Sequence, residues 1–305
     1  MFPGELRAFH VVAQTGSMRK ASETLDVAPS SISRKIALLE HQIGTTLLER
    51  TGAGVVLTHA GKMVAEYARS VVLDYESLRA DLNDRRGTRR RLIGVAAVES
   101  AVSGGLVDAI TVFRAKFPTV AFRAATMSAS DVVERVRHGE SEVGLTFCCS
   151  AHAEVDIVAR IAEPIVLAVP ADHALAGVES IALADLQGMP LALPDVSFSV
   201  RRILDTASHE IGLGAAFTPA FTSNSYEALR NFVHRRAGVA VLPRRAVLRE
   251  SRLGQMKMIP IDHAAFRDTS IDIITLRKRR IPRVVQEFIH ELARTFDAVA
   301  TPPAA

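Results

Sequence analysis

The sequence predicts an α/β protein made of a small helical head with a β-hairpin, a long helix, and a larger domain of alternating strands and helices. Three observations support this fold class. Two short segments between residues 17 and 44 carry apolar residues at helical spacing, one long helical pattern runs from residue 59 to about 86, and strand and helix patterns alternate from residue 92 onward. At 305 residues, of which 48% are hydrophobic, the chain is too long for one compact domain and can fill more than one core.

Residues 17–44 are expected to form two short helices joined by a tight turn. Each helix carries an apolar stripe: Met18, Ala21 and Leu25 on the first, and Ile32, Ile36, Leu39 and Ile43 on the second. Gly16 provides a turn before the pair, and Ser17 is the expected N-cap. Because the two stripes would face each other, the pair, about Met18 to Ala37, is a predicted helix-turn-helix.

The second helix of the pair begins with a polar and basic face. Pro29 takes its first position, and the side opposite the apolar stripe carries Ser30, Ser31, Arg34 and Lys35, with Ser33 at the margin. Short hydroxyls and cations are the side chains that bond phosphate oxygens and base edges. The alternative is a soluble helical hairpin with a charged outer face, and the flanking segments decide against it.

The flanks complete a winged helix-turn-helix over residues 1–58. Leu6, Phe9, Val12 and Ala13 form one face of a preceding helix that can close a three-helix core. After the pair, Arg50 to Thr58 contains Thr-Gly-Ala-Gly between short apolar segments, a pattern typical of a hairpin wing.

At this point the chain resembles the LysR-type transcriptional regulators. The matching residues are Leu6, Phe9, Gly16, Ser17, Ala21, Leu25, Ser33, Arg34, Ile36, Leu39, Glu40, Gly44, Leu47, Arg50, Leu57, Thr58 and Gly61. The resemblance implies a double-stranded DNA operator as partner, with contacts expected from Ser17, Pro29, Ser30, Ser31, Ser33, Arg34, Lys35, Arg50 and Thr58.

Two departures from the family pattern lie in this domain. Ala28 stands at the N-cap of the second helix, where the family usually has Ser or a similar residue, and such a loss typically costs ~1 kcal/mol. Pro29 offsets part of that cost because its fixed φ suits the first helical position. Leu48 stands where Phe is common, which changes core volume but not core chemistry.

Bulk charge does not locate the DNA-binding surface. The net charge is only +4, and much of the excess lies in the runs Arg89 to Arg91 and Arg277 to Arg280, outside the second helix of the pair.

No basic-then-apolar leader follows Met1, and no apolar run approaches the ~18 residues of a membrane span, so we expect a cytoplasmic protein.

The adjacent Cys148 and Cys149 are expected to be buried thiols, with redox sensing as the alternative.

Residues 59–86 form the predicted linker helix. Ala60, Val64, Tyr67, Val71, Tyr75, Leu78 and Leu82 recur at steps of four and three, the spacing of a seam for a partner helix. We therefore expect a homodimer, and the family resemblance adds a homotetramer as a further possibility. The alternative is that the helix packs on its own second domain. Residues 87–91 break the helix and are the expected hinge.

The rest of the chain, residues 92–305, alternates strands and helices. Strands are expected at 92–98, 120–125, 143–147, 164–170, 191–194, 216–221, 239–242 and 271–276, with helices at 105–117, 130–138, 199–211, 226–236 and 282–296. This order implies a mostly parallel sheet. It resembles the family's two-lobed, periplasmic-binding-protein-like effector domain, with lobe one at about 92–162 and 265–305 and lobe two at about 163–264.

Two further departures lie in this domain. Glu142 stands where the family usually has Asp before its third strand. Arg236 stands where the first Gly of a pair before a lobe-two strand is common, so the position is either strained or ordinary helix.

The effector pocket is expected outside the carboxyl ends of the strands, where helix N-termini offer free N–H groups. This rule selects Ser100, Ser103, Ser128, Ser197, Phe198, Arg202, Thr222 and Asn224 as effector-binding residues. Each hydroxyl is by itself more typical of a helix cap, and their convergence is what indicates a site. Arg201 or Arg202 would supply a counter-charge, which favours a small carboxylate as effector.

Two other functional classes are weighed against a regulator. An α/β enzyme would use Ser100 or Ser103 as nucleophile, but Ser100 lacks the Gly-x-Ser-x-Gly elbow, and no metal-ligand spacing or Gly-rich phosphate loop is present. A solute-binding protein is disfavoured by the first 58 residues and by the missing leader. We therefore predict a sequence-specific transcriptional regulator that responds to a small-molecule effector and uses no catalytic residue, metal or cofactor.

Overall fold

The computed structural model describes residues 4–52, 54–84, 91–150, 152–213, 217–277 and 279–300. They divide into two compact units, residues 4–84 with 279–282, and residues 91–277 with 283–300. Of the predicted hinge, only Arg91 falls among the described residues, and it is the first residue of a strand.

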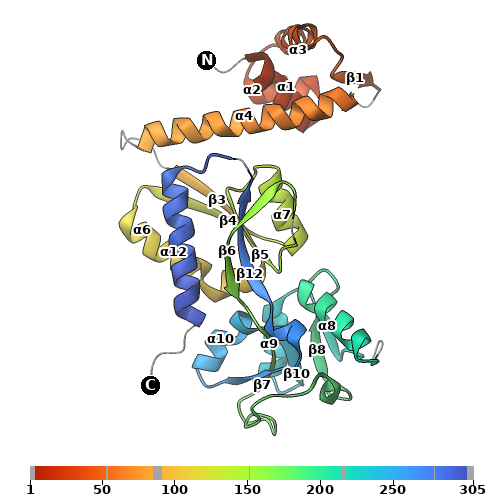
Figure 1. Cartoon of the computed structure of the whole chain (residues 1–305), viewed down its shortest axis with the longest axis vertical. Coiled ribbons are helices and arrows are strands. Elements are labelled where there is room, and N and C mark those ends of the chain that lie inside the picture. Colours follow the sequence, from red (N-terminus) through yellow and green to blue (C-terminus); the bar gives the residue numbers. More distant parts are fainter. Residues whose placement is uncertain are drawn as a thin grey trace. The chain divides into compact units, whose positions relative to one another are not determined.

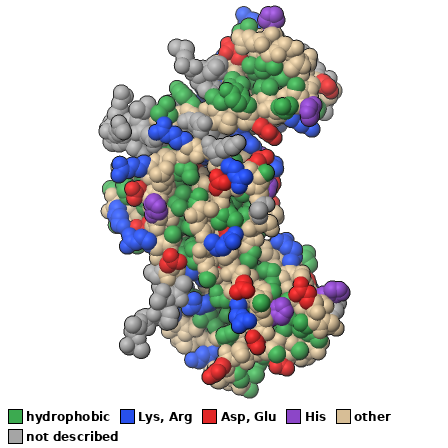
Figure 2. Space-filling view, in the orientation of Figure 1, with side chains coloured by type: hydrophobic (Ala, Val, Ile, Leu, Met, Phe, Trp, Pro, Cys, Tyr) green, Lys and Arg blue, Asp and Glu red, His purple; other side chains and the backbone are tan. Residues whose placement is uncertain are grey.

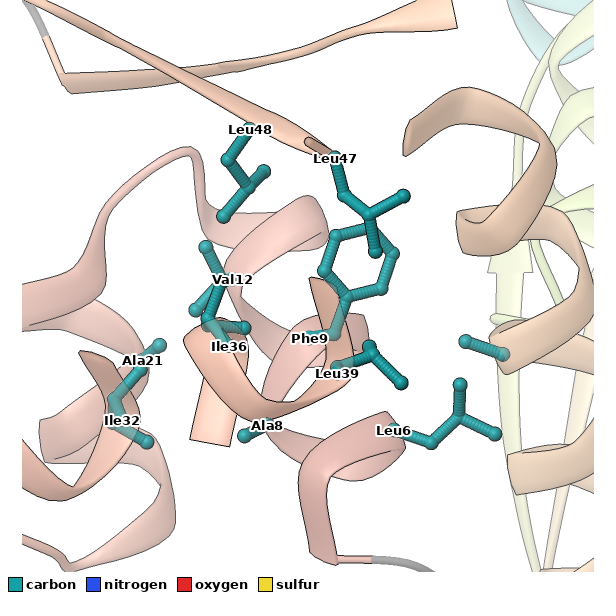
Figure 3. Packing of buried hydrophobic residues seen from close by; sticks show 11 residues of the cluster. Leu6, Ala8, Phe9, Val12, Ala21, Ile32, Ile36, Leu39, Leu47 and Leu48 are labelled. Atoms are coloured by element: carbon teal, nitrogen blue, oxygen red, sulfur yellow. The ribbon is translucent and has the colours of Figure 1, made fainter. Parts of the chain in front are cut away.

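The first unit begins with three helices, α1 (Gly4–Thr15), α2 (Met18–Leu25) and α3 (Pro29–Ile43), as predicted. Their apolar stripes form one core, which Leu47 and Leu48 close from the start of β1 (Leu48–Thr51) (Figure 3). Strand β1 pairs antiparallel with β2 (Gly54–Leu57), which confirms the hairpin. Leu48 is 8% exposed, so the Phe-to-Leu departure lies inside this core.

The turns of the head follow from local chemistry. The Ser17 hydroxyl accepts a hydrogen bond from the Lys20 amide at 3.4 Å and caps α2, whereas Ala28 gives α3 no side-chain cap. The Glu40 carboxylate accepts bonds from the amides of Leu47 and Leu48 at 2.7 and 3.1 Å. This side chain fixes the hairpin to α3.

Helix α4 (His59–Asp84) packs only some of its apolar residues against the head. Ala68 is buried, and Ala60, Val64 and Val71 pack partly buried against the core of the head. Met63, Tyr67, Tyr75 and Leu78 are instead exposed, at 63, 64, 42 and 42%. The predicted seam was therefore wrong in part, because Ala60, Val64 and Val71 pack on the head, whereas Tyr67 and Leu78 of the same pattern are exposed.

The second unit has two lobes, each built on one five-stranded sheet (Figure 1). The sheet of lobe one has the order β4 (Val120–Thr126), β3 (Arg91–Ala97), β5 (Val143–Phe147), β12 (Ser270–Leu276) and β6 (Val155–Ala162). Helices α6 (Val107–Lys116) and α12 (Arg283–Ala300) cover one face and α7 (Ala129–Arg137) covers the other (Figure 1).

The sheet of lobe two has the order β11 (Met256–Pro260), β7 (Ile165–Pro170), β10 (Val239–Pro243), β8 (Leu191–Pro194) and β9 (Phe221–Ser223). Its helices are α8 (Ser199–Glu210), α9 (Tyr226–His234), α10 (Arg244–Arg252) and the short α11 (Ala264–Arg267), with a 3₁₀ turn at Leu183–Leu186.

The prediction of mostly parallel sheets was wrong for half of the pairings. Strand β3 runs parallel to β4 and β5, but β12 is antiparallel to β5 and β6, and β7 is antiparallel to β10 and β11. The antiparallel strands are those at which the chain crosses between lobes, because a crossing strand enters its sheet from the opposite end. Strands β6 and β11 and helix α10 were not predicted, and β9 begins at the last residue of its predicted range.

The helix predicted at 105–117 begins irregularly. A short α5 (Glu99–Ala101) leads into a π-helical turn (Val102–Leu106) before α6. Gly105 has a φ of +149°, and a Cβ on Gly104 would lie 2.5 Å from the Cβ of Arg245. The two glycines therefore give this turn its shape and leave room for an arginine from lobe two.

Arg245, in the first turn of α10, joins the lobes through a buried ion pair. Its amide donates to the Glu163 carboxylate at 2.7 Å, and its guanidinium pairs with the same carboxylate and donates to the Phe296 carbonyl at 3.0 Å. The side chains of Arg245 and Glu163 are only 2% and 1% exposed. Glu163 lies between β6 and β7, and its backbone bonds to Thr269 on the returning strand crossing. The two segments in which the chain passes between the lobes are thus held together at Glu163 and Thr269.

The buried pair predicts a pH dependence of stability. Burial raises the pKa of the Glu163 carboxyl from 4.5 to about 7, which outweighs the opposite effect of Arg245. The folded protein therefore binds more protons than the unfolded chain between these values. The contribution of this group is full below the lower value and is lost as the pH rises through the upper one. The free energy of unfolding should fall by about 1 kcal/mol per pH unit in this range.

Urea unfolding followed by circular dichroism measures this slope, since the chain has no tryptophan. Glu163→Gln should remove the slope, and the exposed control Glu179→Gln should keep it. A Glu163→Gln protein with the wild-type slope would contradict the assignment.

Candidate functional site

The polar face of α3 is open. Ser30 and Arg34 are exposed, and Ser31, Ser33 and Lys35 are half-buried. Within the described part of the head, none of these five side chains takes part in a hydrogen bond or ion pair. Their donors and acceptors are therefore available to a partner, as the sequence predicts for a helix that reads DNA.

Three other predicted DNA-binding residues are placed differently. The Ser17 hydroxyl caps α2, and the Thr58 hydroxyl donates to the Thr46 carbonyl at 2.8 Å and accepts from the Gly61 amide at 2.9 Å. Both hydroxyls thus have structural partners. Arg50 lies in β1 opposite Val55, and its side chain is outside the described residues. Figure 2 shows acidic and basic side chains interspersed on the visible face of the second unit, so charge alone marks no DNA surface there.

A cavity of about 270 Å³ lies between the two lobes of the second unit. Its lining comes from Val98, Glu99, Ser100, Thr126, Met127, Ser128, Ala129 and Phe147 in lobe one, and from Ser197, Phe198, Ser199, Val200, Asn224 and Tyr226 in lobe two. These residues follow the carboxyl ends of the parallel strands β3, β4, β8 and β9, with Phe147 at the end of β5. The cavity therefore lies where the crevice rule for α/β sheets places a ligand.

Five of the predicted effector residues meet in this cavity: Ser100, Ser128, Ser197, Phe198 and Asn224. Ser103, Arg202 and Thr222 do not line it. The π-helical turn changes the register after Ser100, so Ser103 is exposed and its hydroxyl donates to the Glu99 carbonyl. Arg202 donates to the Ser199 hydroxyl at 3.0 Å, and Thr222 is exposed in β9.

The expected arginine counter-charge is also absent from the lining. Arg201 pairs with Asp205 at 2.9 Å, one turn along α8, and neither it nor Arg202 lines the cavity. Among the described lining residues there is no lysine, arginine or histidine.

Glu99 begins the segment from which Ser100 and Ser103 were chosen, but it was not among the predicted effector-binding residues. In the structure it bridges the lobes. Its carboxylate accepts bonds from the amides of Tyr226 and Glu227, at 3.0 and 3.3 Å, and so occupies the N-terminus of α9. Burial raises the pKa of the Tyr226 hydroxyl, and the negative Glu99 adds to the effect, so Tyr226 is a neutral phenol. The position of Glu99 directly after an apolar strand was the available signal.

The helix N-termini at the cavity differ in how they are satisfied. The Ser128 hydroxyl caps α7 by accepting from the Asp131 amide at 3.2 Å. At α9, amides of the first turn donate to the Ser225 hydroxyl and to the Glu99 carboxylate. Helix α8 has no side-chain cap, and within the described chain the amides of Ser199 and Val200 donate to no acceptor. One open helix N-terminus thus faces the cavity.

Arg236 shows a strained turn rather than ordinary helix. Its φ is +57°, just after the end of α9, where the family usually has Gly. Its guanidinium pairs with Asp172 at 2.7 Å. Arg236 therefore adopts the left-handed conformation at some cost in backbone strain, and it does not line the cavity.

The two cysteines have the properties of unactivated thiols. Cys148 and Cys149 are half-buried after β5, and burial raises the pKa of both thiols, with the neighbouring Asp272 acting in the same direction.

Among the described residues, no three His, Cys, Asp or Glu side chains gather as a metal site. None of the described helices is long and apolar enough to cross a membrane.

An open DNA-reading helix and a separate unit with a ligand-sized cavity between two lobes define the class of ligand-responsive transcription factors. Family models agree. The model described as "Bacterial regulatory helix-turn-helix protein, lysR family" matches residues 3–62, and that described as "LysR substrate binding domain" matches residues 86–297. The chain belongs to the LysR family of bacterial transcriptional regulators, whose matching domains are those of regulators and not of enzymes.

Two curated relatives match over most of their length. A probable RuBisCO transcriptional regulator of Guillardia theta is 26% identical over 297 residues, 96% of this chain and 95% of the relative. The RuBisCO operon transcriptional regulator of Allochromatium vinosum is 26% identical over 264 residues, 87% of this chain and 86% of the relative.

Solved structures show the same fold. A full-length OxyR variant of Pseudomonas aeruginosa is similar with a TM-score of 0.69 and 22% identity, over 97% of this chain and 94% of that one. Full-length CbnR in complex with its target DNA has a TM-score of 0.53 and 23% identity, over 97% of this chain and 100% of that one. The winged helix-turn-helix, linker helix and two-lobed α/β arrangement is therefore shared.

Proposed function

We propose that this regulator binds a specific DNA operator through α3 and that a small-molecule effector between the two lobes changes that binding. The open polar face of α3 is the observation that supports DNA reading most directly. In this proposal Arg34 and Arg50 contact phosphates, and Ser30, Ser31 and Ser33 lie close enough to read base edges. Such a protein would act on DNA in the cytoplasm.

We further propose that the effector is a small carboxylate. The support is the uncapped N-terminus of α8, whose free amides at Ser199 and Val200 face the cavity and can bind an anion without an arginine. The Ser100 and Ser197 hydroxyls line the same cavity and can add hydrogen bonds.

The exposed stripe of α4 supports a homodimer, which could in turn assemble as a homotetramer. Met63, Tyr67 and Leu78 remain exposed on the helix that packs Ala60, Val64 and Val71 against the head. A second copy of the same stripe would remove these large side chains from water in a self-complementary contact.

The first prediction from this proposal concerns Arg34. Arg34→Ala should weaken binding to every DNA sequence and reduce the salt dependence of affinity by about one phosphate contact. Fluorescence anisotropy over a salt series, with operator and unrelated DNA, measures both quantities. Arg7→Ala on α1 removes the same charge from an exposed site and is the control. If Arg34→Ala keeps the wild-type affinity and slope, Arg34 is not in the interface.

The second prediction concerns assembly. Tyr67→Glu should bury a carboxylate without a partner in the dimer, at a cost of several kcal/mol, and should produce monomers in sedimentation experiments at low micromolar concentration. Lys62→Glu, on an exposed side of the same helix away from the stripe, should remain dimeric. A dimeric Tyr67→Glu protein would rule out this stripe as the interface.

The third prediction concerns the effector. A carboxylate at a hundred times its dissociation constant should stabilise the protein by about 2.7 kcal/mol, which a thermal-shift screen detects. Ser100→Ala should lose the effector response while it keeps operator binding without effector. Ser103→Ala, three residues away but outside the cavity, should respond as wild type does. An affinity untouched by Ser100→Ala would place the effector elsewhere.

A further inference from the structure

The cavity between the lobes carries a negative charge that nothing positive in its lining balances. Glu99 is the single acidic residue of the described lining, which holds no lysine, arginine or histidine. The backbone amides that Glu99 accepts from are dipoles and not full charges, so α9 offsets the carboxylate only in part.

Glu99 also keeps unused acceptor capacity. Each of its oxygens accepts one backbone bond, Oε2 from Tyr226 and Oε1 from Glu227. An ionised carboxylate offers about four lone-pair sites, so each oxygen can accept a further hydrogen bond, and Glu99 lines the cavity. A charged donor there would form the stronger, charge-assisted type of hydrogen bond.

The rest of the cavity offers hydrogen-bond donors that can bind a carboxylate. The free amides of Ser199 and Val200 lie at the open end of α8. Ser100 is 1% exposed, lines the cavity, and makes no hydrogen bond with any residue that the structure describes. Its hydroxyl is therefore available to donate a hydrogen bond to a ligand in the cavity.

A simple carboxylate would bring a second negative charge into the cavity with Glu99. Repulsion at such short range is poorly screened, because the surrounding protein has a lower effective dielectric than water. A ligand that carries both signs avoids this repulsion, since it places a cation against Glu99 and its carboxylate against α8.

We infer that the effector is an amino acid or a closely similar amino carboxylate, whose protonated amine binds Glu99 and whose carboxylate binds Ser100 and the N-terminus of α8. This inference rests on the proposed function and names the ligand class of the same cavity. Met127, Phe147 and Phe198 in the lining provide apolar contact for a hydrocarbon side chain or spacer.

Matched ligand sets test the inference with the full-length protein. The probes are the common amino acids and short ω-amino acids, each beside its des-amino acid and its amide, which keep only the carboxylate or only the amine. Thermal shift finds binders, and isothermal titration measures their affinities. We expect the best amino acid to bind at least tenfold more tightly than its des-amino acid, the ratio that one charge-assisted contact of ~1.4 kcal/mol provides.

The variant Glu99→Gln tests the residue itself. A neutral amide still accepts a hydrogen bond but lacks the charge, so the preference for the amino acid over the des-amino acid should shrink to less than about threefold. Glu99→Asp keeps the charge and should keep a preference for the amine. Glu227 bonds to Glu99 through its backbone amide, which Glu227→Gln leaves in place, and its side chain is outside the cavity lining, so this variant should behave as wild type does. Circular dichroism confirms that each variant is folded.

The outcomes separate this inference from the proposed function. If des-amino acids bind wild type as tightly as amino acids do, the inference is overturned and the carboxylate proposal stands. If the preference for an amine is unchanged in folded Glu99→Gln, Glu99 is not its partner and the inference also fails. If no member of any set binds, the carboxylate effector itself is wrong.

Discussion

The second unit depends on one buried ion pair, Arg245 with Glu163. Burial is costly for both groups, which is why the pKa of the Glu163 carboxyl is raised, and part of the cost is offset because the arginine contacts this carboxyl group and the carbonyl of Phe296 in the facing lobe. Gly104 has no side chain because Arg245 occupies that space. Both strand crossings meet at Glu163 and Thr269, so the relative position of the lobes, and with it the cavity, rests on this point.

The segment from Glu99 to Leu106 belongs to both the cavity and the lobe junction. Glu99 and Ser100 line the cavity, and Gly104, about one turn further, contacts Arg245. A ligand shifts a conformational equilibrium only by the difference in its affinity for the two states. Because Glu99 bonds across the lobes while it faces the cavity, a ligand that engages Glu99 acts directly on an inter-lobe contact.

Much of the site could be predicted from local sequence, and the remainder could not. The reading helix was found because Ile32, Ile36 and Leu39 repeat at helical spacing and fix which face is polar. Arg202 and Ser103 were misplaced because such side chains can bond to a nearby hydroxyl or backbone carbonyl as readily as to a ligand. Strand β6 was missed since its apolar residues are mixed with Asp156 and Arg160, which pair with residues distant in sequence.

The sequence by itself determined the family, the order of the elements, the helix-turn-helix with its Ser17 cap, and the strand ends around which a pocket would form. Each of these depends on periodicity or on bonds between residues a few positions apart. Only the tertiary structure decided that β12 runs antiparallel to β5, that Val64 and Val71 serve the head, and that Glu99 occupies the N-terminus of α9. Contacts between residues distant in sequence leave no local pattern, because they arise only when the chain is folded.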